Sequence, residues 1–181
     1  MRRLTAYSCT NEDATELLAA LKGLPRLRTL GLTVHSAWPG MLSDALEGVS
    51  ILNWDHWVHL PPMAQLAHRL TSLTLAGAVS LPPDWRHLTQ LRELRIFAND
   101  AASAEHTGLR RAAWGSGTLS ALTALTCLNM NALYGAGIPG AAEVASAPAL
   151  AEVVVPGGDA SVWGRALRAM RPNVLVREEL R

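Results

Sequence analysis

A short apolar pattern recurs along this chain and limits its fold more than any other feature. One copy is LRELRIFAN, in which Leu91, Leu94 and Ile96 lead to Asn99. Other clear copies share this spacing: Leu27, Leu30 and Leu32; Leu70, Leu73 and Leu75; Leu125, Leu128 and Met130; Leu150, Val153 and Val155. Weaker copies are Leu4 and Ala6; Leu46, Val49 and Ile51; Val174 and Val176. The residues between these positions differ from copy to copy, so the pattern indicates shared packing.

This spacing predicts one short strand in each repeat, with apolar side chains on one side. A single strand cannot bury its apolar side alone, so neighbouring repeats must stack and share a continuous core. The middle position of each repeat then gives a series of aligned anchors: Leu4, Leu30, Val49, Leu73, Leu94, Leu128, Val153 and Val174.

The pattern resembles that of the leucine-rich repeat proteins. The segments LAGAVSLPP (75–83) and LYGAGIPG (133–140) are similar to plant-type repeats, in which a glycine turn leads to an outer section that starts with proline. The resemblance implies an α/β fold, a curved solenoid of about six to eight short parallel strands with helical or irregular outer sections. Because the repeats cover the whole chain, we expect a single domain over 1–181, or a fragment of a longer array, with an insertion near 100–117, where the step between anchors is longest.

Two of the outer sections have helical patterns. The segment 11–23 begins with Asn and Asp, carries leucines at helical spacing and ends at glycine. The segment 158–172 places Trp163, Leu167 and Met170 on one predicted face and stops at Pro172.

The charge balance argues against nucleic acid or an anionic membrane as partner. The chain has 16 basic and 15 acidic residues and a formal net charge of +1. A nucleic-acid-binding surface needs a basic patch or stripe, so we expect no nucleic acid partner. The sequence lacks an apolar run long enough to span a bilayer, so we also expect no membrane insertion.

The two cysteines, Cys9 and Cys127, favour an intracellular and cytoplasmic location, because they are too few for a disulfide framework. In the stacked arrangement they lie roughly five strands, about 24 Å, apart, whereas a disulfide requires Cα atoms within about 7 Å. The family resemblance adds association with the cytoskeleton or the cilium axoneme.

One cluster could carry chemistry. In NWDHWVH, Asp55, His56 and His59 would suit a zinc ion if they shared a helical turn. The segment runs from a repeat strand into two prolines, which favours a connecting loop in which Trp54 and Trp57 cover the end of the core. The glycine-rich segments match neither a P-loop nor a dinucleotide-binding fingerprint, and Ser8, Cys9 and Cys127 do not stand in a nucleophile elbow. We therefore expect no enzyme and no cofactor, with a small metal-dependent hydrolase as the alternative.

The family resemblance implies that residues beside the anchors point outward on a concave sheet face. The first row is Arg3, Thr29, Gly48, Ser72, Glu93, Cys127 and Glu152; the second is Thr5, Gly31, Ser50, Thr74, Arg95, Asn129 and Val154; the third is Tyr7, Thr33, Leu52, Ala76, Phe97, Asn131 and Pro156. Arginine and aromatic side chains are the usual anchors of an interface. The predicted partner-binding residues are Tyr7, Glu93, Arg95, Phe97, Asn129 and Asn131.

These features predict a non-catalytic scaffold or adaptor that binds a protein through this concave face. A second contact is expected at the N-terminal edge, because Met1 lies within the first repeat and exposed strand edges pair readily with other chains. A fragment of a larger receptor is a further alternative to the scaffold. The identity of the partner does not follow from the sequence.

Overall fold

The computed structural model describes residues 3–9, 28–34, 46–59, 66–80, 83–97, 117–130, 138–156 and 160–179. Within these ranges the strands are β1 (Arg3–Cys9), β2 (Thr29–Val34), β3 (Gly48–His59), β4 (Ser72–Ser80), β5 (Glu93–Phe97), β6 (Cys127–Asn129), β7 (Glu152–Pro156) and β8 (Leu175–Glu179). The helical elements are the 3-10 helix η2 (Pro83–His87) and the α-helices α3 (Thr118–Ala121), α4 (Ala141–Ala145) and α5 (Ala160–Met170).

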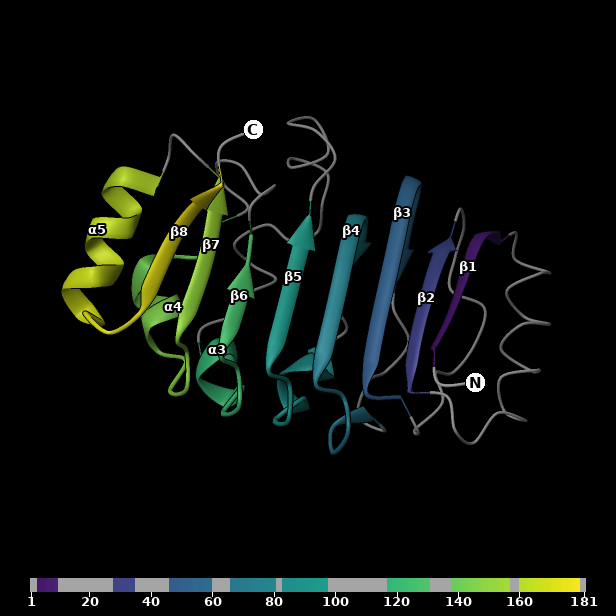
Figure 1. Cartoon of the computed structure of the whole chain (residues 1–181), viewed down its shortest axis with the longest axis horizontal. Coiled ribbons are helices and arrows are strands. Elements are labelled where there is room, and N and C mark those ends of the chain that lie inside the picture. Colours follow the sequence, from purple (N-terminus) through teal and green to yellow (C-terminus); the bar gives the residue numbers. More distant parts are fainter. Residues whose placement is uncertain are drawn as a thin grey trace.

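The strands form one open, eight-stranded sheet in which every strand is parallel to its neighbours. Their order in space is their order in the sequence, from β1 at one edge to β8 at the other (Figure 1). Helix α5 lies beyond β8 at the end of the sheet. The α/β prediction with parallel strands is therefore confirmed.

The strand register follows the apolar anchors. Leu94 of β5 pairs with Leu73 of β4 and with Leu128 of β6, and the alignment continues outward from there. The full aligned series is Leu4, Leu30, Val49, Leu73, Leu94, Leu128, Val153 and Val176.

The last member of this series differs from the prediction, which placed Val174 at the middle position. The turn before β8 closes when the N–H of Val174 donates to the carbonyl of Arg171, at 3.1 Å. Val174 therefore takes the position that Leu150 holds before β7, but β8 begins one residue sooner after it. Val176 is consequently the residue that pairs with Val153.

The anchors and the strand connections share one core. The anchors from Leu30 to Val176 pack with buried residues of the connections, among them Leu66, Leu88, Leu122 and Leu167. Because strands alternate their side chains between the two faces, this core covers one face of the sheet. We call the other side, which carries the three rows defined above, the open face.

A repeated hydrogen-bond pattern sets the strand starts at one level. The carbonyl just before a strand accepts two backbone N–H bonds from the start of the next strand, at distances between 2.7 and 3.1 Å. These carbonyls belong to Arg28, Glu47, Thr71, Arg92 and Thr126. The Thr71 hydroxyl adds a bond to the Glu47 carbonyl, and the Thr126 hydroxyl adds one to the Arg92 carbonyl, both at 3.0 Å. Aligned starts place the first-row residues side by side across the sheet.

Two side chains join the last repeats. The guanidinium of Arg171 donates to the carbonyls of Ala145, Ala147, Pro148 and Leu150, at 2.9 to 3.4 Å. It thereby satisfies acceptors at the end of α4 and in the turn that leads to β7. The indole Nε1 of Trp163 in α5 donates to the carbonyl of Pro139 at 2.8 Å.

Several local predictions require correction. The segment containing Asp55, His56 and His59 is strand, because β3 extends to His59 and pairs again with β4 at Val58 and Val79. Gly77, expected in a turn, lies within β4 and pairs with Asn53 of β3.

The helix expected over 158–172 is present as α5, but only part of its predicted apolar face is buried. Leu167 is fully buried and Trp163 is half-buried, whereas Met170 is 45% exposed at the last position of the helix. The expected helix over 11–23 and nearly all of the insertion over 100–117 lie outside the described residues.

Candidate binding groove on the open face

Most described residues in the first two rows of the open face are more accessible than the core-facing anchors between them, although Gly31 and Gly48 are buried. Thr29, Ser50, Ser72 and Thr74 are half-buried, and Arg95 is exposed. The accessible part of the open face thus lies near the strand starts and is mostly polar.

Further along the strands the open face is more buried than the sequence predicts. Ala76 and Pro156 of the third row are buried, and so is Val154 of the second row. Val154 stands in register between Asn129 and Arg177, whose longer side chains rise beside it. The accessible surface is therefore concentrated in the first two rows.

A groove of about 380 Å³ crosses this surface. Its lining comes from β1 to β5 and from the residues just before β3 and β4: Arg3, Thr29, Glu47, Gly48, Val49, Ser50, Thr71, Ser72, Thr74, Glu93 and Arg95. Most of these are first-row and second-row residues, so the common register of the strands builds the groove.

The middle of the groove is small and rich in hydroxyl groups. Thr29, Ser50, Ser72 and Thr74 supply these hydroxyls from three consecutive strands. Gly48 lies between Thr29 and Ser72 in the first row and has no side chain to fill the space. A Cβ at this position would meet its nearest neighbour, Cγ2 of Thr29, at 3.5 Å, which is ordinary van der Waals contact. Gly48 itself is buried, so a small side chain fits at this position and would narrow the groove beside Thr29 and Ser72.

The β5 side of the groove ends in a connected polar cluster. Arg95 Nε donates to Glu93 Oε1 at 2.8 Å, and Ser72 Oγ donates to Glu93 Oε2 at 3.2 Å. Both oxygens of the Glu93 carboxylate are thus engaged, and the charge of Arg95 is balanced within the groove.

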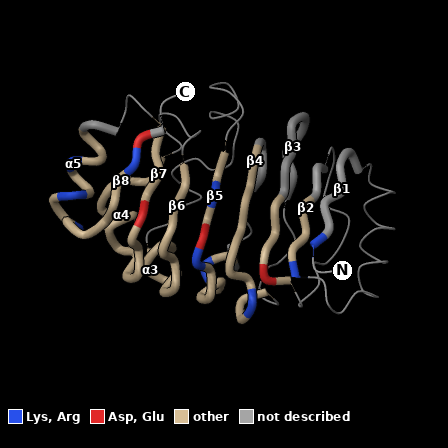
Figure 2. The backbone as a smooth tube through the Cα atoms, viewed as in Figure 1, with Lys and Arg blue, Asp and Glu red and all other residues tan. Residues whose placement is uncertain are grey.

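The other charged residues of the groove are unevenly compensated. Glu47 forms an ion pair with Arg28, with Arg28 Nε 3.0 Å from Glu47 Oε1. Arg3, at the β1 side, is exposed and forms no ion pair with the described residues. Figure 2 shows these charged positions near the starts of the strands, with β4 and β6 carrying no charge. Among the described residues, Arg3 is therefore the charged residue of the groove that has no ion-pair partner.

Beyond the groove, the first row continues through Cys127 of β6 to Glu152 of β7. Arg177 of β8 forms an ion pair with Glu152, at 3.0 Å from Nε to Oε1. Partial burial raises the pKa of the Cys127 thiol, and the negative charges of Glu152 and Glu93 raise it further, against smaller opposite effects of Arg95 and Arg177. The protonated thiol is therefore the favoured form at neutral pH, which makes Cys127 a poor nucleophile.

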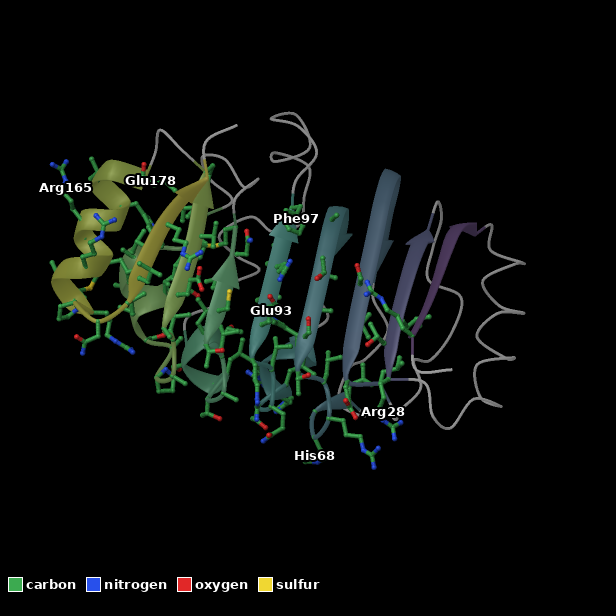
Figure 3. The ribbon with its side chains drawn as sticks, viewed as in Figure 1. Arg28, His68, Glu93, Phe97, Arg165 and Glu178 are labelled. Carbon is green, nitrogen blue, oxygen red and sulfur yellow. The ribbon has the colours of Figure 1, made fainter. Side chains whose placement is uncertain are left out.

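The structure brings together only part of the predicted partner-binding set. Glu93 and Arg95 line the groove, whereas Phe97 lies half-buried at the far end of β5 from Glu93 (Figure 3). Asn129 is half-buried on β6, outside the groove lining. Tyr7 belongs to β1, but its side chain is outside the described part of the structure, as is the whole of Asn131.

The sequence prediction of the binding set omitted Arg3, Gly48 and the hydroxyl residues. All of them stand in the first two rows, but singly they look like ordinary small or surface residues. These residues share one register across five consecutive strands, and this signal could have identified them in the sequence. The residue paired with Arg3 on β2 is Thr29, which is not a carboxylate.

The proposed metal cluster has its backbone in β3, and the side chains of Asp55, His56 and His59 lie outside the described residues. Within the described part of the chain, no group of three or more His, Cys, Asp or Glu residues is placed to hold a metal ion. Among the same residues, no helix has the length and apolar character needed to cross a membrane.

A scan against models of known protein families gives no match to this chain, and no curated protein matches it in sequence.

Proposed function

We propose that this chain is a non-catalytic protein-binding scaffold of the leucine-rich repeat type, a curved solenoid that holds its partner on the open face. The observation that carries the proposal is the groove of about 380 Å³ across five consecutive strands. Its walls come from aligned rows of different side chains, while the anchors between them are uniformly apolar and buried. Such a division suits a repeat array that keeps its core constant and varies its binding surface.

The chemistry of the groove supports binding more than catalysis. Its carboxylates, Glu47 and Glu93, each form an ion pair with an arginine. The thiol of Cys127 has a raised pKa, and Cys127 does not line the groove. Hydroxyl groups in half-buried surroundings are good hydrogen-bonding partners for a peptide backbone.

The proposal includes an intracellular location, supported by the low cysteine content, and the resemblance to leucine-rich repeat proteins directs it to cytoskeletal or axonemal assemblies. Fractionation of cells that express the tagged chain tests this part. Recovery in the secreted fraction would contradict it.

Affinity capture with matched variants tests the function itself. The tagged chain is compared with Gly48→Val, with the double variant Arg95→Glu/Phe97→Ala, and with Arg165→Ala. Arg165 is exposed on α5 and lies far along the sheet from Glu93 (Figure 3), so Arg165→Ala controls for a lost arginine outside the open face.

We expect the chain and Arg165→Ala to retain the same partner, and both open-face variants to lose it. Equal retention by all four proteins would reject the open face as the binding surface. Each variant is first checked by thermal unfolding, so that loss of binding is separated from loss of fold.

A further inference from the structure

The dimensions of the groove define the shape of its occupant. The groove runs across the strands from Arg3 of β1 to Glu93 and Arg95 of β5. Four strand spacings cover about 19 Å, and an extended peptide of roughly six residues has this length. The hydroxyls of Thr29, Ser50 and Thr74 lie along the path and can bond to a peptide backbone.

The charges define its composition. Arg28 compensates Glu47, and Arg95 compensates Glu93, so neither pair leaves a net charge for the occupant to balance. Arg3 is the exception, because it is exposed and has no ion-pair partner among the described residues. Its register neighbour on β2 is Thr29, which cannot supply a negative charge.

We propose that the groove binds an extended acidic peptide segment, with an Asp or Glu carboxylate of the partner paired with Arg3 and the rest of the segment lying across β2 to β5. This inference rests on the proposed function and adds the chemical class and the orientation of the partner segment. A basic segment is disfavoured, because it would bring a second positive charge to the end of the groove where Arg3 is uncompensated.

The test uses three libraries of hexapeptides with blocked ends. Each library has two adjacent positions fixed as glutamate, glutamine or lysine, and random residues elsewhere. Because the ends are blocked, binding of the glutamate library reports side-chain carboxylates. Retention on the immobilised full chain is measured for the original protein, Arg3→Gln, Arg3→Lys, Arg3→Glu, Gly48→Val and the control Arg165→Ala.

We expect the original chain to retain the glutamate library about threefold better than the glutamine library, as suits one exposed ion pair. Arg3→Gln should abolish the preference, Arg3→Lys should keep most of it, and Arg3→Glu should move it to the lysine library. Arg165→Ala should behave like the original chain. Raising the salt to about 0.5 M should remove the preference by screening.

The outcomes separate this inference from the proposed function. If the glutamate and glutamine libraries are retained equally and Gly48→Val loses both, the groove binds peptides but the acidic assignment is wrong. If Gly48→Val retains peptides as well as the original chain, or if no library is retained, both proposals are wrong. Should Gly48→Val fail to fold, Ser50→Gln replaces it, because Ser50 lines the groove and is only half-buried.

Discussion

The two faces of the sheet are built from alternate residues of the same strands, yet they follow different rules. On β5, Leu94 is fully buried, whereas the next residue, Arg95, is exposed. The core-facing anchors are leucine, isoleucine, methionine or valine in every repeat with described side chains. The open face carries arginine, glutamate, glycine, serine, threonine and cysteine at equivalent positions.

The reason for the difference is what each residue touches. A core-facing anchor contacts the anchors of both neighbouring strands, so a change in its size or polarity disturbs three repeats together. An exposed open-face residue such as Arg95 has solvent on one side, so its substitution costs little stability unless it forms a specific polar contact. Stability should therefore depend on the covered face, and recognition on the open one.

Leu94→Asp provides the strongest test of this contrast. The substitution places a carboxylate at a fully buried position between Leu73 and Leu128, where it has no partner. We expect a loss of at least about 4 kcal/mol in the free energy of unfolding, enough to unfold a marginally stable domain. Urea unfolding followed by circular dichroism measures the loss.

The neighbouring substitution Arg95→Asp is the control, and it should cost about 1 kcal/mol or less, because it removes one exposed ion pair and leaves like charges at positions 93 and 95. If position 95 proved more sensitive than position 94, the assignment of the two faces would be wrong by one residue.

Arg171→Ala tests a polar contact on the covered side. This guanidinium donates to four backbone carbonyls at the end of α4 and in the turn after it, and its loss would remove all four charged hydrogen bonds, although the Ala147 carbonyl would still accept from the N–H of Leu150. We expect a loss of about 2 kcal/mol in the free energy of unfolding, in the range for hydrogen bonds to a charged group. Thermal unfolding measures the change.

Arg168→Ala is the matched control, because Arg168 is exposed and forms a single bond of 3.4 Å to the carbonyl of Val176. It should change stability by only a few tenths of a kcal/mol. Arg171→Lys should recover little of the loss, since one ammonium group cannot reach four carbonyls. Equal effects of Arg168→Ala and Arg171→Ala would contradict the role given to Arg171.

The same contrast explains how much of the fold could be predicted. The apolar spacing predicts the parallel strands and most of the register, because the anchors of each repeat pack against those of the next in the same way. It fails at Val174, because β8 begins one residue after Val174, whereas β7 begins two residues after Leu150, although the same kind of turn bond precedes both strands. It also fails to predict the length of β3, because the strand regains its partner at Val58 and Val79 after an irregularity in register.

The site was harder to predict than the fold. Glu93 and Arg95 stand out in the sequence by their charge, and they do line the groove. Gly48, Ser50 and Thr74 carry no such signal, because their contribution is the space and the hydroxyls that they provide next to one another. That Arg3 has no ion-pair partner among the described residues depends on which residues stand beside it in the sheet, so this property could be found only from the three-dimensional contacts.

The reactivity of Cys127 tests the electrostatics of the open face. Burial, Glu152 and Glu93 raise the pKa of its thiol, so iodoacetamide should modify it several-fold more slowly at pH 8 than free cysteine. Glu152→Gln removes one of the causes, and the pKa should fall and the reaction should accelerate. Alkylation is followed by mass spectrometry in a Cys9→Ser background, so that only Cys127 reacts.

The direction of the pH effect on stability follows from the same shift. Above the ordinary pKa of cysteine the unfolded chain releases the thiol proton, while the folded chain keeps it until the raised pKa is passed. Cys127 therefore lowers stability as the pH rises above that ordinary value, and Cys127→Ser should reduce the loss. A thiol that reacts as fast as free cysteine would contradict the raised pKa.

Gly48→Ala is the prediction with the smallest effect on stability. It separates the stability of the fold from recognition by the open face most directly. The added Cβ meets its neighbours at 3.5 Å or more, so the strand accepts it without strain. Alanine also loses less conformational entropy than glycine on folding, so the free energy of unfolding should rise by about 0.5 kcal/mol. The substituted chain should nevertheless retain the hexapeptide libraries less well, because a methyl group occupies part of the groove.

Gly117→Ala is the contrasting control, since its φ of 86° is unfavourable for a side chain and alanine there should lower stability by about 1 kcal/mol. A gain in stability with a loss of binding at position 48 would mean that the glycine serves recognition, whereas unchanged binding would mean that the space beside Thr29 and Ser72 is not used.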